Sequence, residues 1–188
     1  MRARDNPFST DRVLRVRYRP QGWTWDHLLA RLKELDYRGA IVGPEGHGKT
    51  TLMEDLALHL EAQGWGVRHL RLTREKPKFD RAFLRDFFDR LTDRDVILFD
   101  GAEQMGRLAW WWFKRRAGVA RGLVITSHRA GLLPTLVVCE TNPALLEGIV
   151  DDLIPGAPDT RRIADSLFRR HRGNVRDALR ELYDVHAD

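Results

Sequence analysis

One eight-residue segment constrains the fold of this chain more than any other. Residues 43–50 read GPEGHGKT and have the spacing G-x-x-x-x-G-K-[S/T], with an apolar run at 40–42 before them. After the segment, Leu52, Leu56 and Leu60 recur on one stripe of a helical pattern. In such a turn glycines let backbone N–H groups face an anion, and the N-terminus of the next helix adds partial positive charge. The segment therefore predicts a buried strand, a phosphate-binding loop and a helix in direct succession.

The residue types in this loop, a Walker A sequence, also predict the ligand. We expect ATP with Mg²⁺, with Lys49 reaching the β- and γ-phosphates and Thr50 ligating the cation. The alternative is a glycine-rich turn with an accidental lysine, which the flanking strand and helix disfavour. His47 is expected to face solvent and to have no catalytic role. The residues predicted to contact the nucleotide are Gly43, Pro44, Glu45, Gly46, His47, Gly48, Lys49, Thr50 and Thr51.

As far as residue 140, the chain alternates between strand and helix patterns. Phe79, Phe83, Phe87 and Leu91 recur every four residues, which predicts a helix face in the core. Apolar strands separated by helices imply a parallel sheet covered on both faces, and right-handed crossovers make it doubly wound. We therefore expect an α/β P-loop NTPase fold with a five-stranded parallel sheet. Strands are expected at 40–42, 67–73, 96–99, 123–126 and 136–140, and helices at 24–36, 49–63 and 108–120.

Past Glu140 the pattern contains helices only. Thr141 or Asn142 can cap the first of them, and two more start near Thr160 and Asn174. Three short amphipathic helices in a row predict a small C-terminal helical subdomain. The expected division is an N-terminal arm and helix at 1–37, an NTPase core at 38–141 and a helical lid at 142–188.

An acidic residue at the end of a buried strand is the expected second half of the site. Asp100 directly follows the apolar run 96–99, and we expect it to hold Mg²⁺ through water or together with Thr50. The alternative is an ordinary strand-terminal Asp-Gly turn. Glu103 lies three residues further on. It either orients the attacking water or is the first-turn acid of the next helix.

Composition limits the setting and the partners. Lys and Arg outnumber Asp and Glu by 32 to 27, and a net charge of +5 permits nucleic-acid contact without requiring it. The one cysteine, Cys139, lies in an apolar run, so we expect its side chain to be buried. A single cysteine cannot form an internal disulfide, which favours a reducing, cytoplasmic setting. No histidine pairs with it at metal-ligand spacing, so no structural zinc is expected. No apolar run approaches the ~20 residues that span a bilayer, and no apolar segment typical of a secretory signal follows the N-terminus.

In order along the chain, residues 43–51, residues 96–103, the polar strand tip 126–129 and the helical tail resemble an AAA+ or closely related STAND-type ATPase. The resemblance covers residues 38 to the C-terminus. It implies that a polar residue, here Thr126 or Ser127, ends the strand between the two site-bearing strands and contacts the γ-phosphate or the water.

The resemblance also implies a lid arginine at the start of the last helix. Arg176, in the segment Gly-Asn-Val-Arg, is the candidate, and would close the lid over the γ-phosphate. On sequence alone it is equally an exposed helix arginine. The predicted catalytic residues are then Lys49, Asp100, Glu103, Ser127 and Arg176, with Thr50 and Asp100 at the metal.

Two departures from the family pattern bear on catalysis. Gly101 stands where the family has Glu directly after the strand-ending Asp, so Glu103 would have to substitute. The arginine finger that one subunit lends to its neighbour is not identifiable either. Slow or partner-stimulated hydrolysis is therefore expected. The candidates for the finger are Arg115, Arg116, Arg121 and Arg129.

The sequence thus predicts an Mg-dependent ATPase that acts as a nucleotide-gated switch with a protein partner. A GTPase is disfavoured because no Asn-Lys-x-Asp segment occurs. A small-molecule or nucleoside kinase is an alternative, with arginines at 161–172 gripping phosphates, although no acceptor-binding signature follows the loop. A nucleic-acid-dependent ATPase is another, because residues 110–116 combine four aromatics with three cations. Four consecutive aromatics point all around a helix, so at least two must be buried, and core packing or a partner interface is favoured.

Overall fold

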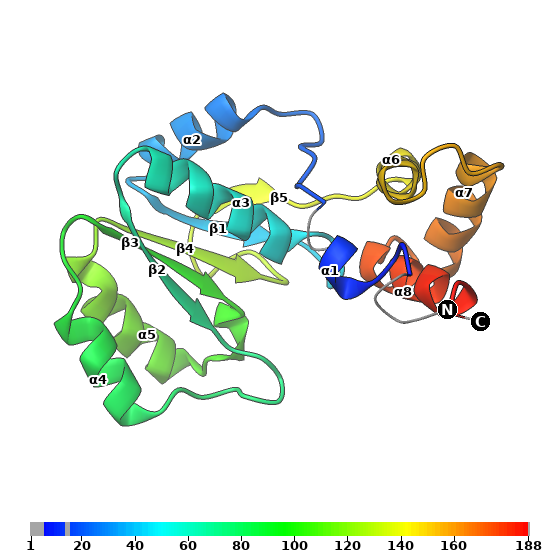
Figure 1. Ribbon diagram of the computed structural model, residues 1–188. Coiled ribbons are helices and arrows are strands. Elements are labelled where there is room, and N and C mark those ends of the chain that lie inside the picture. Colours follow the sequence, from blue (N-terminus) through cyan, green and yellow to red (C-terminus); the bar gives the residue numbers. More distant parts are fainter. Residues whose placement is uncertain (1–5, 14–15, 188) are drawn as a thin grey trace. The chain divides into compact units, whose positions relative to one another are not determined.

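The computed structural model describes residues 6–13 and 16–187 (Figure 1). The described residues divide into two compact units. The first, the sheet unit, comprises Gly22–Gly43 and Leu52–Val138. The second, the helical unit, comprises the described residues up to Gln21, Pro44–Thr51 and the chain from Cys139 onward.

The sheet unit is built on five parallel strands in the order β2-β3-β4-β1-β5. This arrangement confirms the predicted α/β fold with a doubly wound parallel sheet. Because β4 lies between β1 and β3, the carboxyl ends of these three strands meet at one edge. The strands are β1 Arg38–Val42, β2 Gly66–Arg71, β3 Asp95–Asp100, β4 Gly122–Ser127 and β5 Thr135–Val138.

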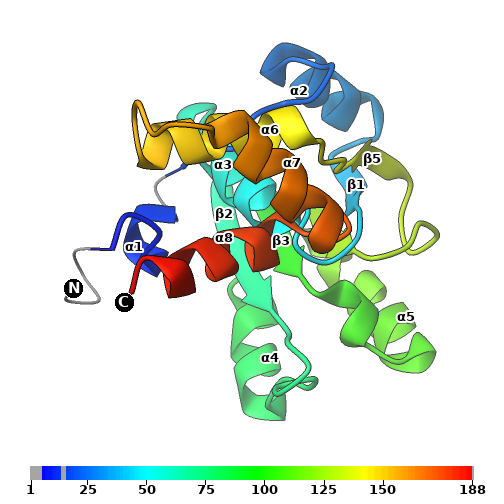
Figure 2. The same cartoon turned by 90° about the vertical axis from the view of Figure 1, so that its right-hand side faces the viewer.

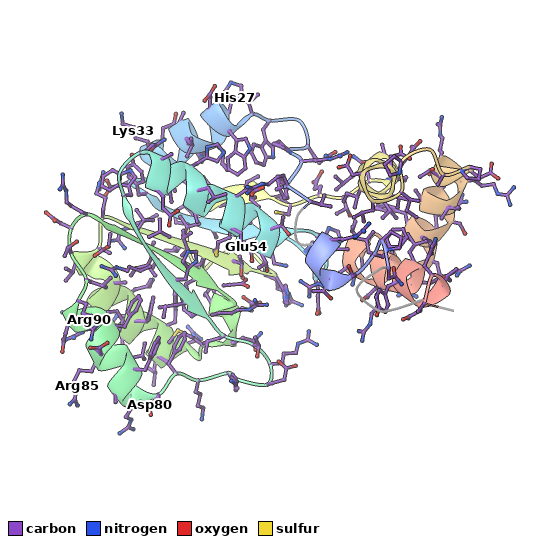
Figure 3. All side chains as sticks on the ribbon, in the orientation of Figure 1. His27, Lys33, Glu54, Asp80, Arg85 and Arg90 are labelled. Carbon is purple, nitrogen blue, oxygen red and sulfur yellow. The ribbon has the colours of Figure 1, made fainter. Side chains whose placement is uncertain are left out.

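Helices cover both faces of this sheet, with α2 and α3 on one face and α4 and α5 on the other (Figure 1). Thr24 caps α2 as predicted, because its hydroxyl accepts the His27 N–H. His27 and Lys33 of α2 project away from the sheet (Figure 3), and Glu54 of α3 is exposed. The helices are α2 Trp25–Glu34, α3 Lys49–Ala62, α4 Arg81–Asp89 and α5 Arg107–Arg116, with 3-10 turns at Ala102–Gln104 and Ala117–Val119.

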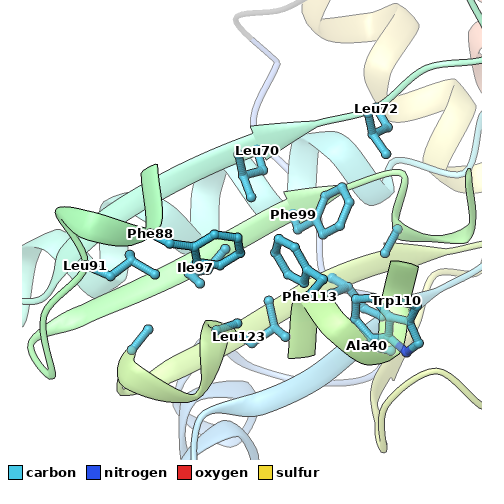
Figure 4. Packing of buried hydrophobic residues seen from close by; sticks show 14 of the residues in the cluster. Ala40, Leu70, Leu72, Phe88, Leu91, Ile97, Phe99, Trp110, Phe113 and Leu123 are labelled. Atoms are coloured by element: carbon cyan, nitrogen blue, oxygen red, sulfur yellow. The ribbon is translucent and has the colours of Figure 1, made fainter. Parts of the chain in front are cut away.

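Aromatic rings fill the core between the sheet and the pair α4 and α5 (Figure 4). Phe99 of β3 and Phe113 of α5 are fully buried, with ring centroids 5.1 Å apart. In α5, Trp110 and Phe113 are buried while Trp111 and Trp112 are exposed, which confirms that at least two of the four aromatics lie in the core.

The predicted four-residue aromatic repeat is wrong at Phe83, which is 49% exposed. Asp80 caps α4 and the helix ends at Asp89, so a nine-residue helix is too short to carry the whole repeat. The ring that α4 buries is Phe88, whose centroid lies 5.4 Å from that of Phe113. Leu91 is buried beyond the end of the helix.

The helical unit contains the three predicted C-terminal helices and a short N-terminal one, and Figure 2 looks onto α6, α7 and α8. Asn142, one of the two predicted caps, accepts the Leu145 N–H at 2.7 Å. Phe8 is buried in the same apolar cluster as these helices, and Asn6 donates its side-chain amide to the Tyr183 carbonyl. The helices are α1 Thr10–Val13, α6 Pro143–Leu153, α7 Thr160–Arg170 and α8 Val175–Val185.

The N-terminal residues therefore share a core with the C-terminal helices. The boundaries 1–37, 38–141 and 142–188 stay a prediction. Cys139 is fully buried, as expected. In the described part of the chain, no helix combines the length and the apolar character needed to cross a membrane.

Candidate nucleotide-binding site

The loop after β1 leaves the sheet at Gly43, whose N–H donates to the Ser127 carbonyl at 3.2 Å. Two of its residues, Gly46 and Gly48, have φ angles of +76° and +78°. A side chain is strained in that left-handed region, so the turn requires glycine at both positions. The loop thus turns through two left-handed glycines just before α3 begins.

Lys49 is the first residue of α3 and is only 8% exposed. Its ammonium donates to the Pro44 carbonyl at 2.7 Å, which ties the end of the loop to its start. A buried lysine is costly without anionic or polar partners, which fits a side chain held for an anionic ligand.

Close neighbours within the helical unit also require glycine in the loop. A Cβ on Gly46 would lie 1.7 Å from Oδ1 of Asn174, and one on Gly48 would lie 3.2 Å from the ring of Tyr18. Asn174 is the N-cap of α8 and accepts the Asp177 N–H at 3.1 Å. The loop therefore packs directly against the start of α8.

His47 is partly buried rather than fully solvent-facing. Its Nδ1 lies 3.4 Å from the hydroxyl of Thr141, which donates to the Gly173 carbonyl at 2.8 Å. Burial lowers the pKa of His47, a backbone hydrogen bond at Cys139 opposes that shift, and the charge of Lys49 adds to it. A neutral ring at neutral pH follows. Burial also raises the pKa of the Tyr18 hydroxyl and of the Cys139 thiol, which contact each other.

At the carboxyl edge of the sheet, Asp100 is held from both neighbouring strands. The hydroxyl of Thr126 donates to its Oδ1 at 2.6 Å and accepts the Gly101 N–H at 2.9 Å. Arg71 Nε lies 3.5 Å from the other carboxylate oxygen. The carboxylate is 18% exposed, and both of these partners help to orient it.

Ser127 follows Thr126 but has a different role. Its hydroxyl donates to the Arg129 carbonyl at 2.7 Å, closing a turn of its own, and the residue is 2% exposed. Because Phe99 pairs with Ile125, the next residues along the two strands, Asp100 and Thr126, lie side by side. Of the two polar residues proposed for this strand tip, Thr126 is the one that contacts Asp100.

Glu103 lies in the 3-10 turn after β3, with a half-buried side chain. Its Oε1 is 3.4 Å from Nδ1 of His128. Its Oε2 is buried and has no hydrogen-bond partner within the described residues. A buried carboxylate oxygen of this kind needs a water, an ion or a ligand group to satisfy it.

The backbone conformation at Gly101 explains why no acidic residue directly follows Asp100. Its φ is +82°, and a Cβ there would lie 2.3 Å from the Leu72 carbonyl oxygen. Both strain and a backbone clash exclude a glutamate. An acid that acts beside Asp100 must therefore come from a later position, and Glu103 is such a position.

The predicted arginines differ in their surroundings. Arg176 is exposed at the second position of α8. Arg116 lies 3.5 Å from Asp89 and Arg121 lies 2.6 Å from Asp36, so both are ion-paired within the chain. Arg115 covers the ring of Trp111 with its guanidinium 5.3 Å from the centroid, and Arg129 is exposed.

Neither the comparison with protein-family models nor that with curated proteins gave a match. Among solved structures, the chain is similar to a single-substitution variant of RuvB from Thermotoga maritima, an AAA+ ATPase, with a TM-score of 0.62 and 19% sequence identity. The similarity covers 90% of this chain and 64% of the RuvB chain. At this identity the likeness concerns the fold alone. The chain therefore has an α/β P-loop NTPase fold similar to that of the RuvB structure.

Proposed function

We propose that this chain binds ATP with Mg²⁺ at residues 43–51 and acts as a nucleotide-gated switch that hydrolyses ATP slowly. The observation that carries the proposal is the loop itself. Gly46 and Gly48 have positive φ angles directly before the buried Lys49 at the first residue of α3. This is the backbone arrangement that turns successive N–H groups toward phosphate oxygens.

The donor set fits a magnesium nucleotide. Lys49 supplies a cation for the β- and γ-phosphates, and Thr50 and Asp100 supply the oxygens that hard cations prefer. When bound, the metal neutralises charge on the phosphates. Thr126 holds the carboxylate of Asp100 in one orientation by its 2.6 Å hydrogen bond. We assign Ser127 to shaping the adjacent turn.

For hydrolysis, we assign to Glu103 the role of orienting the attacking water. Its Oε2, which has no hydrogen-bond partner among residues 6–13 and 16–187, offers an acceptor for a water proton, which is the role of the base in such reactions. The Glu103→Gln variant keeps the shape but loses the charge. It should bind ATP normally and hydrolyse it at least about tenfold more slowly, because general-base catalysis is worth that much or more. A normal rate in this variant would remove Glu103 from the mechanism.

The switch would act through the contact between Gly46 and the cap of α8. A loop that rearranges around phosphates must move Asn174, and Arg176 lies two residues further along the same helix. We therefore assign Arg176 to sensing the γ-phosphate. An exposed apolar stripe on α5, with Leu108 at 86% and Trp111 at 58% exposure, supports a protein partner.

Isothermal calorimetry with ATP and Mg²⁺ tests the proposal. Wild-type protein should bind, and Lys49→Ala should bind at least about tenfold more weakly, because a charge-assisted contact to phosphate is lost. Lys33→Ala is the matched control, since Lys33 is exposed on α2 (Figure 3). Circular dichroism checks that each variant is folded. Wild-type protein that binds no ATP would refute the proposal.

Two further measurements on the same protein test whether neighbouring copies share a site and whether the reaction is hydrolysis or phosphoryl transfer. A hydrolysis rate per subunit that rises with protein concentration would indicate a site shared between neighbouring copies. Phosphoryl transfer to nucleosides or small alcohols would favour the kinase alternative over the switch.

A nucleic-acid-dependent ATPase is the second candidate, favoured by α5. Trp111 and Trp112 are exposed, and Arg115 stacks on Trp111. Exposed aromatics beside arginines can stack on unpaired bases and bind their phosphates. Stimulation of ATP hydrolysis by single-stranded DNA or RNA, lost in Trp111→Ala, would favour this candidate. An unchanged rate at low salt would remove it.

A further inference from the structure

Arg71, the last residue of β2, lies beside the carboxylate that ends β3. The strand register pairs Arg71 with Asp100, and its Nε lies 3.5 Å from Oδ2. The other oxygen, Oδ1, accepts the hydroxyl of Thr126 from the opposite neighbouring strand at 2.6 Å. A positive charge and a neutral hydroxyl thus hold the two oxygens of one carboxylate.

The ion pair is not needed to hold the fold together. The side chain of Arg71 is 62% exposed, and an exposed ion pair contributes little to stability. Nor is Arg71 fixed in place by packing, since β2 presents it at its exposed end. The main effect of Arg71 is therefore electrostatic. Its guanidinium offsets the negative charge with which the Asp100 carboxylate would bind a metal ion.

We propose that Arg71 is the counter-ion of Asp100 and sets the Mg²⁺ concentration at which nucleotide binds. This inference rests on the proposed function, because it takes Asp100 as the ligand of the cation. Arg71 and a divalent cation compete for the same carboxylate, and like charges at such distances repel. Arg71 therefore raises the concentration of Mg²⁺ that loading requires, whereas its charge can only favour metal-free binding of the nucleotide phosphates.

Titrating Mg²⁺ against a fluorescent ATP analogue at low salt tests this. In Arg71→Gln, the Mg²⁺ concentration for half-maximal binding should fall about three- to tenfold, while affinity in EDTA should not rise, because the lost charge attracts phosphates. Arg71→Lys keeps the charge and should behave like wild type. Arg90→Gln is the matched control, because Arg90 is an exposed, ion-paired arginine at the C-cap of α4 (Figure 3) whose loss changes the net charge equally.

The outcomes separate the inference from the function on which it rests. Mg²⁺-dependent binding with the same midpoint in wild type and Arg71→Gln would overturn the role of Arg71 alone. An equal shift in Arg90→Gln would also overturn it, because the effect would then be one of net charge. Wild-type protein that binds no analogue at any Mg²⁺ concentration would overturn the proposed function itself. A thermal melt of each variant confirms that the fold is retained.

Discussion

The hydroxyl of Thr126 connects two residues of the neighbouring strand end: it donates to Asp100 at 2.6 Å and accepts the Gly101 N–H at 2.9 Å. Thr126 is 1% exposed, so water cannot replace these bonds. Thr126→Val removes the hydroxyl at nearly constant shape and should lower the free energy of unfolding by about 1–3 kcal/mol, as measured by urea denaturation.

Ser127→Ala is the control for this change. Within the described part of the chain, its hydroxyl bonds the backbone of Arg129, an exposed residue, so water can take over the freed carbonyl and the loss should be smaller. Equal stability of Thr126→Val and wild type would contradict the role of the hydroxyl.

Placing a glutamate directly after Asp100, as in the ATPases that the sequence resembles, should damage the protein rather than improve it. Gly101→Glu places a Cβ 2.3 Å from the Leu72 carbonyl at a φ of +82°, so it should destabilise the fold by more than about 2 kcal/mol. Gly64→Glu is the matched control, because Gly64 has a φ of +84° with no atom near the added Cβ. Thermal unfolding of both variants measures the difference. If Gly101→Glu were as stable as Gly64→Glu, the clash would be refuted.

The sequence predicts the loop and the order of strands and helices well because their signals are local. The glycines and lysine of residues 43–50 lie within one turn, and each strand shows as a short apolar run. Crossover rules predict a doubly wound parallel sheet for a chain with this alternation, but they do not fix the order of its strands. The position of β4 between β1 and β3 was expected from the resemblance to AAA+ ATPases.

Contacts between distant segments could not be predicted in the same way. Whether Thr126 or Ser127 contacts Asp100 depends on the register of β3 against β4. Apolar runs in a sequence do not fix that register to the exact residue. Phe83 was misplaced because the ends of α4 decide which ring faces the sheet. Phe8 joins the core of the C-terminal helices across most of the chain length, and no local pattern signals that pairing.

Acid should weaken the sheet unit through Asp95. Burial alone would raise the pKa of this carboxyl, but hydrogen bonds from Thr92 and Arg68 outweigh it and hold the pKa below 3.8. A carboxyl whose pKa is lower in the folded than in the unfolded state stabilises the fold above its unfolded pKa. That contribution is lost as pH falls below about 4 and through the lowered folded value.

Urea denaturation of wild type and Asp95→Asn at several pH values measures this contribution. Near neutral pH the variant should be the less stable protein, because it lacks the charge that these donors bind. The gap between the two free energies of unfolding should narrow as the pH drops below about 4. Parallel curves over that range would show that Asp95 has the same pKa in both states.

The contact between Gly46 and Asn174 couples the loop to α8, and a double-mutant cycle can measure it. Gly46→Ala adds backbone strain and a collision with Asn174, whereas Gly156→Ala adds strain alone, because Gly156 has the same φ of +76° and no near neighbour. Gly46→Ala should therefore destabilise more than Gly156→Ala. Asn174→Ala alone should cost about 1 kcal/mol as a lost helix cap. Combined with Gly46→Ala it removes the collision, so the double variant should be at least about 0.5 kcal/mol more stable than additivity predicts. Additive losses in urea denaturation would mean that the loop and the start of α8 respond independently, and the proposed route from phosphate to Arg176 would then fail.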